Sequence, residues 1–206
     1  MISINEFIKL FPGHFKAQKD WFPWQVTQHL GNILTGLMEQ LDTSFEIVEG
    51  IALHKTARVE KGAILKAPLI IGEDCFIGSN SCLRGGVYLG NSVRIGMGCE
   101  IKASIIFNGS AIAHFNFIGD SIIGSYVNFE AGSITANHYN ERDDKEILVI
   151  HNLTIISTGI DKFGALVGDY SKIGANAVLS PGTLLPPQSI VKRLQLVDQV
   201  SQKNNS

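Results

Sequence analysis

The sequence predicts an all-β protein, a parallel β-helix built from six-residue repeats. Counting in sixes from Ile47 meets an aliphatic residue at every step as far as Ile101. Two positions before these anchors the residues are mostly small or β-branched, as at Ala57, Cys75 and Val93. Side chains two apart on a strand point to the same face, so both series are expected to face one interior. A single repeat cannot bury its apolar face alone, so stacked coils must share a core.

Glycine follows the anchor in several repeats, at Gly72, Gly78, Gly90 and Gly96. These glycines predict bends between short strands, where the backbone needs conformational freedom. Three six-residue units complete one triangular coil, so residues 18 apart are expected to stack about 4.8 Å apart. The phase slips near Ile106 and Ile123, and the repeat resumes from Val167 to Val191. We therefore expect the β-helix to span residues 46–193.

One segment inside the repeats lacks the six-residue pattern and is expected to be an inserted loop, at about residues 138–162. Within it, "NERDDKE" is typical of a solvated loop. The stretch "ILVIHNLTII" favours a short hairpin that turns at His151 and Asn152.

The two ends of the chain are expected to lie outside the repeats. Residues 1–45 contain apolar residues at helical spacing between Pro23 and Leu41, which predicts an amphipathic helix. We expect this N-terminal helical cap to cover the first coil, whose open strand edge would otherwise promote aggregation. Residues 194–206 are expected to form a C-terminal tail, and its polar last residues are expected to be disordered.

Composition excludes several classes of function. The 206 residues are 45% hydrophobic with a formal net charge of −2, so no basic field favours a nucleic-acid partner. No secretory leader and no long apolar run indicate export or a membrane partner. Three cysteines, Cys75, Cys82 and Cys99, form no CxxC pair and are expected to be small wall residues. These features favour a cytoplasmic protein.

Cations replace glycine at one of the three corners. Lys66, Arg84 and Lys102 each lie three repeats from the next, so they are expected to form one vertical column. Like charges about 5 Å apart repel one another unless water or an anion lies between them, which makes the column a candidate phosphate site. A solvated basic edge is the alternative, and periodicity does not decide between the two.

His114 lies two repeats after Lys102 and is a candidate proton acceptor. Imidazole changes its protonation state near neutral pH, which suits general-base catalysis, although a lone histidine is more often structural. No two histidines have the close i, i+4 spacing that zinc sites often use, so no metal is expected. Metal-dependent hydration chemistry would need histidines that meet at a subunit interface.

Residues 101–137, "IKASIIFNGSAIAHFNFIGDSIIGSYVNFEAGSITAN", resemble a known family. They are similar to the acetyltransferase half of the bifunctional bacterial enzyme that makes UDP-N-acetylglucosamine, and to related archaeal sugar-phosphate enzymes. These enzymes belong to the left-handed β-helix transferases with hexapeptide repeats. The resemblance is specific from about Arg84 to Asn137 and looser downstream. It implies a left-handed helix, a homotrimer, and acetyl-CoA as co-substrate in nucleotide-sugar biosynthesis.

The resemblance also implies roles for individual residues. His114 matches the base that deprotonates the amine of an amino-sugar phosphate, and Arg84 and Lys102 match the residues that hold the sugar phosphate. The remaining implied contacts are Phe117, Asn128 and Asn137 for the acceptor, and Ala131, Ser157 and Ala175 for the coenzyme. Two positions differ from the family, because Phe117 and His138 stand where tyrosines are common.

The leading hypothesis is therefore an acyl-CoA-dependent N-acetyltransferase that acts on an amino-sugar phosphate similar to glucosamine 1-phosphate. The alternative is a non-catalytic β-helix that serves oligomerisation or sugar-phosphate sensing, which the replacements at Phe117 and His138 favour. A nucleotidyl-transfer half is not expected within this sequence.

Overall fold

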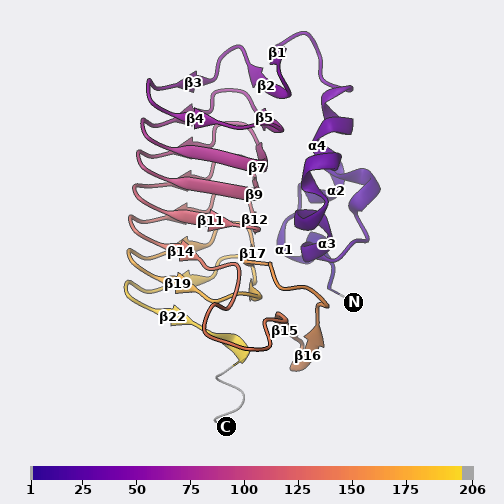
Figure 1. Cartoon of the computed structure of the whole chain (residues 1–206), viewed down its shortest axis with the longest axis vertical. Helices are drawn as coiled ribbons and strands as arrows, with labels where there is room; N and C mark the ends of the chain where they lie inside the picture. The colour runs from indigo at the N-terminus through magenta and orange to yellow at the C-terminus, as the bar shows by residue number, and fades with distance from the viewer. Residues whose placement is uncertain (1, 201–206) are drawn as a thin grey trace.

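A computed structural model of the chain describes residues 2–200. It shows the expected left-handed parallel β-helix, with a layer of short helices packed along one side (Figure 1). Each coil contributes one short strand to each of three faces, and strands of successive coils pair in parallel. The helix is thus a triangular prism, as the repeat predicts.

Face 1 and face 2 meet at one corner of the prism, and face 3 carries the helical layer. Face 1 comprises β4 (Ile64–Leu65), the first half of β7 (Cys82–Leu89), the first half of β9 (Glu100–Ile106), β11 (Phe117–Gly119), β14 (Ile134–Thr135), β19 (Val178–Leu179) and β22 (Leu196–Val197). Face 2 comprises β3 (Arg58–Val59), β6 (Phe76–Ile77), β8 (Arg94–Ile95), β10 (Ala111–Ile112), β13 (Asn128–Phe129), β18 (Lys172–Ile173) and β21 (Ile190–Val191). Face 3 comprises β2 (Ile51–His54), β5 (Leu69–Ile71), the second halves of β7 and β9, β12 (Ile122–Ile123), β17 (Ala165–Val167) and β20 (Thr183–Leu185).

The slip in the repeat is one residue lost at the corner between face 1 and face 3. Leu83 pairs with Ile101, three full repeats further along the chain, but Ile101 pairs with Ile118, which is one position short of three repeats. The register shifts between Arg84 and Val87, because β7 has two glycines at this corner where β9 has a single residue. Full coils and shortened coils therefore stack without loss of pairing.

The interior is filled by the predicted anchors from Ile71 onward. Ile71, Ile101 and Leu179 are fully buried in one continuous cluster that runs the length of the helix. Cys75 and Cys99 are also buried there as wall residues, and burial raises the pKa of the Cys75 thiol to about 11. The first anchor is different, because Ile47 is 48% exposed in an end strand.

The corner glycines are required for close approach of coils rather than for an unusual backbone angle. A Cβ on Gly78 would lie 2.7 Å from the backbone nitrogen of Met97, in the next coil. The positive φ angles fall instead on residues two positions later, such as Asn80 at +59°. The prediction of bends at these glycines was right, but backbone freedom was the wrong reason.

At the N-terminal end of the β-helix, the open edge of the first coil is covered by a hairpin strand and not by a helix. Strand β1 (Phe45–Val48) pairs antiparallel with β2, so it extends the sheet and contains the misassigned anchor Ile47. At the other end β22 pairs with β19, which carries the β-helix to Val197, beyond the expected boundary at residue 193. Most of the predicted disordered tail, from residue 201 on, lies outside the described residues.

The N-terminal region forms several short helices where one amphipathic helix was predicted between residues 23 and 41. They are α1 (Ile4–Phe7), α2 (Phe11–His14), a 3₁₀ turn (Lys16–Gln18), α3 (Pro23–Gln28) and α4 (Leu30–Met38). They lie along face 3 and not over the open end (Figure 1). The predicted position of the N-terminal cap was therefore wrong. The helices lie along face 3 because its outward side chains, such as Ile70, Ile105 and Leu166, are apolar and are buried beneath them. No helix within residues 2–200 is long and apolar enough to span a membrane.

The inserted segment contains the predicted hairpin. Strands β15 (Leu148–His151) and β16 (Thr154–Ser157) pair antiparallel. The turn is at Asn152 and Leu153, one residue later than expected, and both residues have positive φ. That geometry is the two-residue turn whose twist suits a hairpin. The hairpin packs under the helical layer, where Ile147 and Val149 are buried.

An aromatic cluster attaches the helical layer to face 3. The rings of Phe11 and Phe15 pack against Phe107, the residue that follows β9. The ring centroids of His14 and Phe107 are 5.7 Å apart. The Tyr88 hydroxyl is 2.9 Å from His14 Nδ1. Burial raises the pKa of Tyr88 to about 12, so the hydroxyl keeps its proton and shares a hydrogen bond with the imidazole nitrogen.

We predict that this attachment weakens in mild acid. Desolvation by burial lowers the pKa of His14 below 6.5, so the folded state favours the neutral ring. The stabilising contribution is complete above pH 6.5 and is lost as the pH falls through the lowered pKa. Thermal unfolding between pH 8 and pH 5 should show a larger loss of Tm in the wild type than in His14→Gln. An equal loss in both proteins would contradict the prediction, and His54→Gln serves as the control.

Candidate functional site

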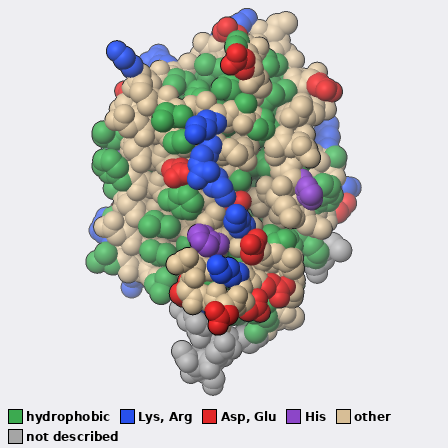
Figure 2. All heavy atoms as spheres, in the orientation of Figure 1, with side chains coloured by type: hydrophobic (Ala, Val, Ile, Leu, Met, Phe, Trp, Pro, Cys, Tyr) green, Lys and Arg blue, Asp and Glu red, His purple; other side chains and the backbone are tan. Residues whose placement is uncertain are grey.

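Basic side chains form the predicted column at the corner between face 1 and face 3, which we call the basic corner. Arg84 in β7 pairs in register with Lys102 in β9. The backbone N–H of Lys66 donates to the carbonyl of Leu83, which places Lys66 one coil before Arg84. Figure 2 shows Lys and Arg side chains in a vertical line on this side of the molecule. The spacing of three repeats thus becomes a spatial column.

Two cations of the column have carboxylate partners, which the repeat pattern did not indicate. Arg84 donates from Nε and Nη2 to one carboxylate oxygen of Glu100, both at 2.6 Å. Lys102 Nζ lies 2.8 Å from Asp120 Oδ2. Alternating carboxylates offset the repulsion between like charges, so any bound phosphate must share these cations with acidic partners. Lys66 is exposed.

Asp120 was missed by the sequence analysis. The shortened coil places Gly119 in register with Lys102, so Asp120 lies beside the column, one residue after it. Its backbone has a positive φ of +46°, and the residue is only 8% exposed. It accepts hydrogen bonds from Lys102 and from Asn137 Nδ2. Asn137 is also buried, and its Oδ1 is 3.3 Å from His138 Nδ1. Lys102, Asp120, Asn137 and His138 thus form one continuous chain.

Phe117 lies on face 1 with its ring turned toward the basic corner. A Cβ on Gly119 would lie 2.7 Å from the Phe117 ring and 3.0 Å from Asn137 Nδ2. The glycine therefore allows the ring to lie flat on the strand, beside the Asn137 amide. Phe117 offers an apolar surface here and no hydroxyl donor.

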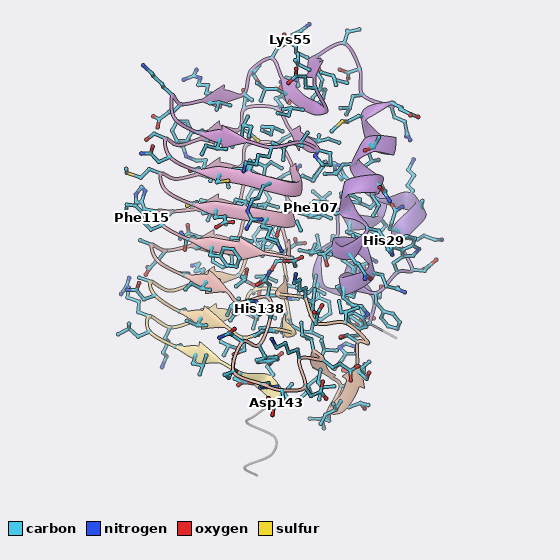
Figure 3. The ribbon with its side chains drawn as sticks, in the orientation of Figure 1. His29, Lys55, Phe107, Phe115, His138 and Asp143 are labelled. Carbon is cyan, nitrogen blue, oxygen red and sulfur yellow. The ribbon has the colours of Figure 1, made fainter. Side chains whose placement is uncertain are left out.

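His114 lies at the opposite corner, between face 2 and face 1, which we call the histidine corner. It follows β10 and precedes β11, and it is exposed. The side chain of Asn116, 2% exposed, donates to the His114 carbonyl and accepts from the Ser133 amide. Nδ1 of the ring lies 3.0 Å from where a Cβ on Gly96 would be, so Nε2 is the outward nitrogen. Figure 3 shows the neighbouring Phe115 at the far side of face 1 from His138.

The residues predicted to bind coenzyme divide between two places. Ala131 and Ala175 stack below His114 in successive coils. The Gly132 N–H donates to the His114 carbonyl, and the Asn176 N–H donates to the Ala131 carbonyl. Ser157 does not join them, since it lies in β16 of the inserted hairpin and donates to Glu146.

A groove on face 2 adjoins the histidine corner. Asn128, Glu130, Lys172 and Arg193 line it. Arg193 holds both oxygens of Glu130 at 2.7 Å. These hydrogen bonds lower the pKa of Glu130 and raise that of Arg193. Asn128 is therefore on the histidine-corner side, separated from the other predicted acceptor residues.

A second groove, of about 320 Å³, lies at the basic corner between the β-helix and the helical layer. It is lined by Lys102 and Asp120, by Thr27 and Gln28 of α3, and by Asp161 and Lys162, where the inserted segment returns. Nothing in the repeat pattern indicated the lining residues of α3 and of the inserted segment, because these elements reach the groove only through tertiary packing.

Apolar side chains form an outward stripe along face 1. Register pairs place them one above another, at Ile64, Cys82, Phe117, Ile134, Val178 and Leu196, with Glu100 between Cys82 and Phe117. The exposed fractions of Ile64 and Leu196 are 51% and 59%. The histidine corner carries its own exposed apolar residues, Met97, Phe115 and Leu194. Within residues 2–200, no group of three or more His, Cys, Asp or Glu side chains is placed to hold a metal ion.

Comparison with known proteins identifies the repeat. A family described as the hexapeptide repeat of succinyl-transferase matches residues 68–103. The chain therefore contains a hexapeptide repeat of the kind found in these transferases.

Two relatives of this hexapeptide-repeat protein are more than twice as long as the part that matches it. A bifunctional sugar-1-phosphate nucleotidylyltransferase/acetyltransferase of Sulfurisphaera tokodaii is 34% identical over 76% of this chain and 36% of its own length. Bifunctional protein GlmU of Methanococcus vannielii is 31% identical over 89% of this chain and 44% of its own length. The chain therefore spans less than half the length of these two relatives. An uncharacterized acetyltransferase of Escherichia coli, YaiX, is 28% identical over 85% of this chain and 79% of its own length.

We predict that the Lys102–Asp120 pair of this hexapeptide-repeat protein stabilises the fold. The Lys102 and Asp120 side chains are only 21% and 11% exposed, so Asp120→Asn leaves a largely buried cation without its counter-charge. Unfolding in urea should show a loss of about 1–3 kcal/mol. Asp74→Asn is the matched control, because Asp74 also has a positive φ but is exposed, and its loss should stay within about 0.5 kcal/mol. Equal effects of the two substitutions would sink the prediction.

Proposed function

We propose that the chain is an acetyltransferase that moves an acetyl group from acetyl-CoA to the amine of a sugar phosphate. The observation that carries the proposal is the pair of corners on face 1: one holds a column of cations and the other an exposed histidine. A relative named as a bifunctional sugar-1-phosphate nucleotidylyltransferase/acetyltransferase supports the substrate class. A phosphate at Arg84 and Lys102 would anchor the acceptor beside Phe117.

His114 acts as the general base in this proposal. Its outward Nε2 takes a proton from the acceptor amine as the nitrogen attacks the thioester carbonyl. The tetrahedral intermediate collapses with cleavage of the carbon–sulfur bond, and the imidazolium returns the proton to the leaving thiolate. A backbone donor near Ala131, one coil below, receives the developing oxyanion. Coenzyme A lies along the histidine corner by Ala175, with the groove at Asn128 and Lys172 beside it.

The two corners of one chain do not form a single site, because the width of face 1 separates them. We infer that a second copy completes the site, its histidine corner lying against the basic corner and apolar stripe of the first. Such a contact joins two different surfaces, so it repeats around a ring. The exposed apolar residues of both surfaces become buried when the ring closes, and a closed ring of three copies suits the triangular prism.

We predict that His114→Ala retains the assembly and loses the chemistry. The buried anchors supply the core, so light scattering should give the mass of three chains for both proteins. Acetyl transfer to glucosamine 1-phosphate should fall by roughly 10² or more, the usual scale for a missing general base.

The wild-type kcat/KM should also fall in acid, since a protonated ring cannot accept the amine proton. The acceptor amine titrates too, so the profile of His114→Ala is the control. A fully active variant would favour the alternative, a non-catalytic module for oligomerisation or sugar-phosphate sensing.

A mixing experiment tests whether the site is shared between copies. His114→Ala and Arg84→Ala each inactivate one half of the site, the second at acceptor concentrations below KM. Co-expressed chains should regain about a quarter of the wild-type activity, because random rings place two intact halves together at one site in four. Lys102→Ala mixed with Arg84→Ala is the control and should show no recovery, because both substitutions damage the same half of the site. No recovery in confirmed mixed rings would refute a site shared between copies.

A further inference from the structure

His138 is the residue at the basic corner to which the proposed reaction gives no role. It is exposed, and it begins the inserted segment that leaves the β-helix after β14. In Figure 3 it lies below the ends of β9 and β11, and Figure 2 shows a histidine at that place at the foot of the line of Lys and Arg side chains. A ligand whose phosphate lies on the column would therefore extend toward this ring.

Hydrogen bonds set the direction of every link that leads to His138. The Asp120 carboxylate, held at 2.8 Å from the Lys102 ammonium, offers only acceptors. Asn137 must therefore turn its NH₂ group toward Asp120, which leaves its Oδ1 facing His138. An amide oxygen is an acceptor, so Nδ1 of the imidazole must carry the hydrogen.

Burial makes this arrangement costly to reverse. Asp120 and Asn137 are 8% and 7% exposed, so a flipped Asn137 amide would bring its oxygen against the Asp120 carboxylate and lose a buried hydrogen bond. In the neutral ring a hydrogen on Nδ1 leaves a lone pair on Nε2. The exposed end of His138 is thus an acceptor and not a donor.

We propose that His138 Nε2 accepts a hydrogen bond from a hydroxyl or amine group of the acceptor, and that Asp120 and Asn137 are positioning residues that fix its tautomer. The inference rests on the proposed function for the identity of the acceptor. A lone pair at this place selects ligands with a donor next to the phosphate, because a phosphate oxygen would face another acceptor. A site built for a donor rejects analogues that lack it.

The tautomer is tested by nitrogen NMR of histidine in the full-length protein at pH 8, without any substrate. His138→Gln assigns the signal by its loss. We expect Nδ1 to be protonated in the wild type, and the population of the other tautomer to rise in Asn137→Leu. A wild-type ring that carries its hydrogen on Nε2 overturns the proposal.

Contact with the acceptor is tested by kinetics with glucosamine 1-phosphate and acetyl-CoA. His138→Phe should raise the KM for the acceptor roughly tenfold, the scale of one lost hydrogen bond, and leave the KM for acetyl-CoA unchanged. His138→Gln should recover part of the loss, because its amide oxygen can accept. His54→Phe, on the first coil, is the matched control and should change neither constant.

The outcomes separate this proposal from the one on which it rests. An active wild type with an unchanged acceptor KM in His138→Phe overturns the contact and leaves the proposed function intact. A wild type that transfers nothing to glucosamine 1-phosphate contradicts the proposed function and the contact together. The NMR measurement of the His138 tautomer still tests the hydrogen-bond chain in that case.

Discussion

The parallel pairing of each strand with the strand one coil away is the constraint on which the rest of the structure depends. It converts a spacing of one coil along the chain into direct contact, as for Arg84 and Lys102 or Ile101 and Ile118. Inward columns become a continuous apolar core. Outward columns become the basic corner and the stripe of face 1, which is apolar except at Glu100. The same pairing therefore builds both the stability of the prism and the surfaces that it presents.

Corners are where this constraint is relaxed. A corner accepts one residue fewer, as at Ala103, or a long insertion, as after Thr135, without disturbing the strands on either side. The insertion leaves and returns at the basic corner, where Asn137 and Lys162 meet groups from the repeats. Polar and charged residues can gather there because the neighbouring coils already hold the backbone in place.

Charge balance decides how the basic corner behaves. Arg84 and Lys102 each have a carboxylate partner, so the column is a preorganised set of ion pairs and not a field of free cations. The Asp120 carboxylate also fixes the Asn137 amide, and through it the His138 ring. One acidic side chain thus links the cations of the repeat to the first residues of the insertion. Polar networks of this kind are effective only when every buried member has a partner.

The sequence by itself determined the β-helix, the extent of its core from Ile71 onward, the inserted hairpin and the stacking of Arg84 on Lys102. All of these depend on a repeating local period, which is legible along the chain. Only the tertiary structure decided that the helices lie along face 3, that Glu100 and Asp120 neutralise the column, and that His114 lies a full face away from it. These features depend on which corner a residue occupies and what packs there, and the period does not encode that packing.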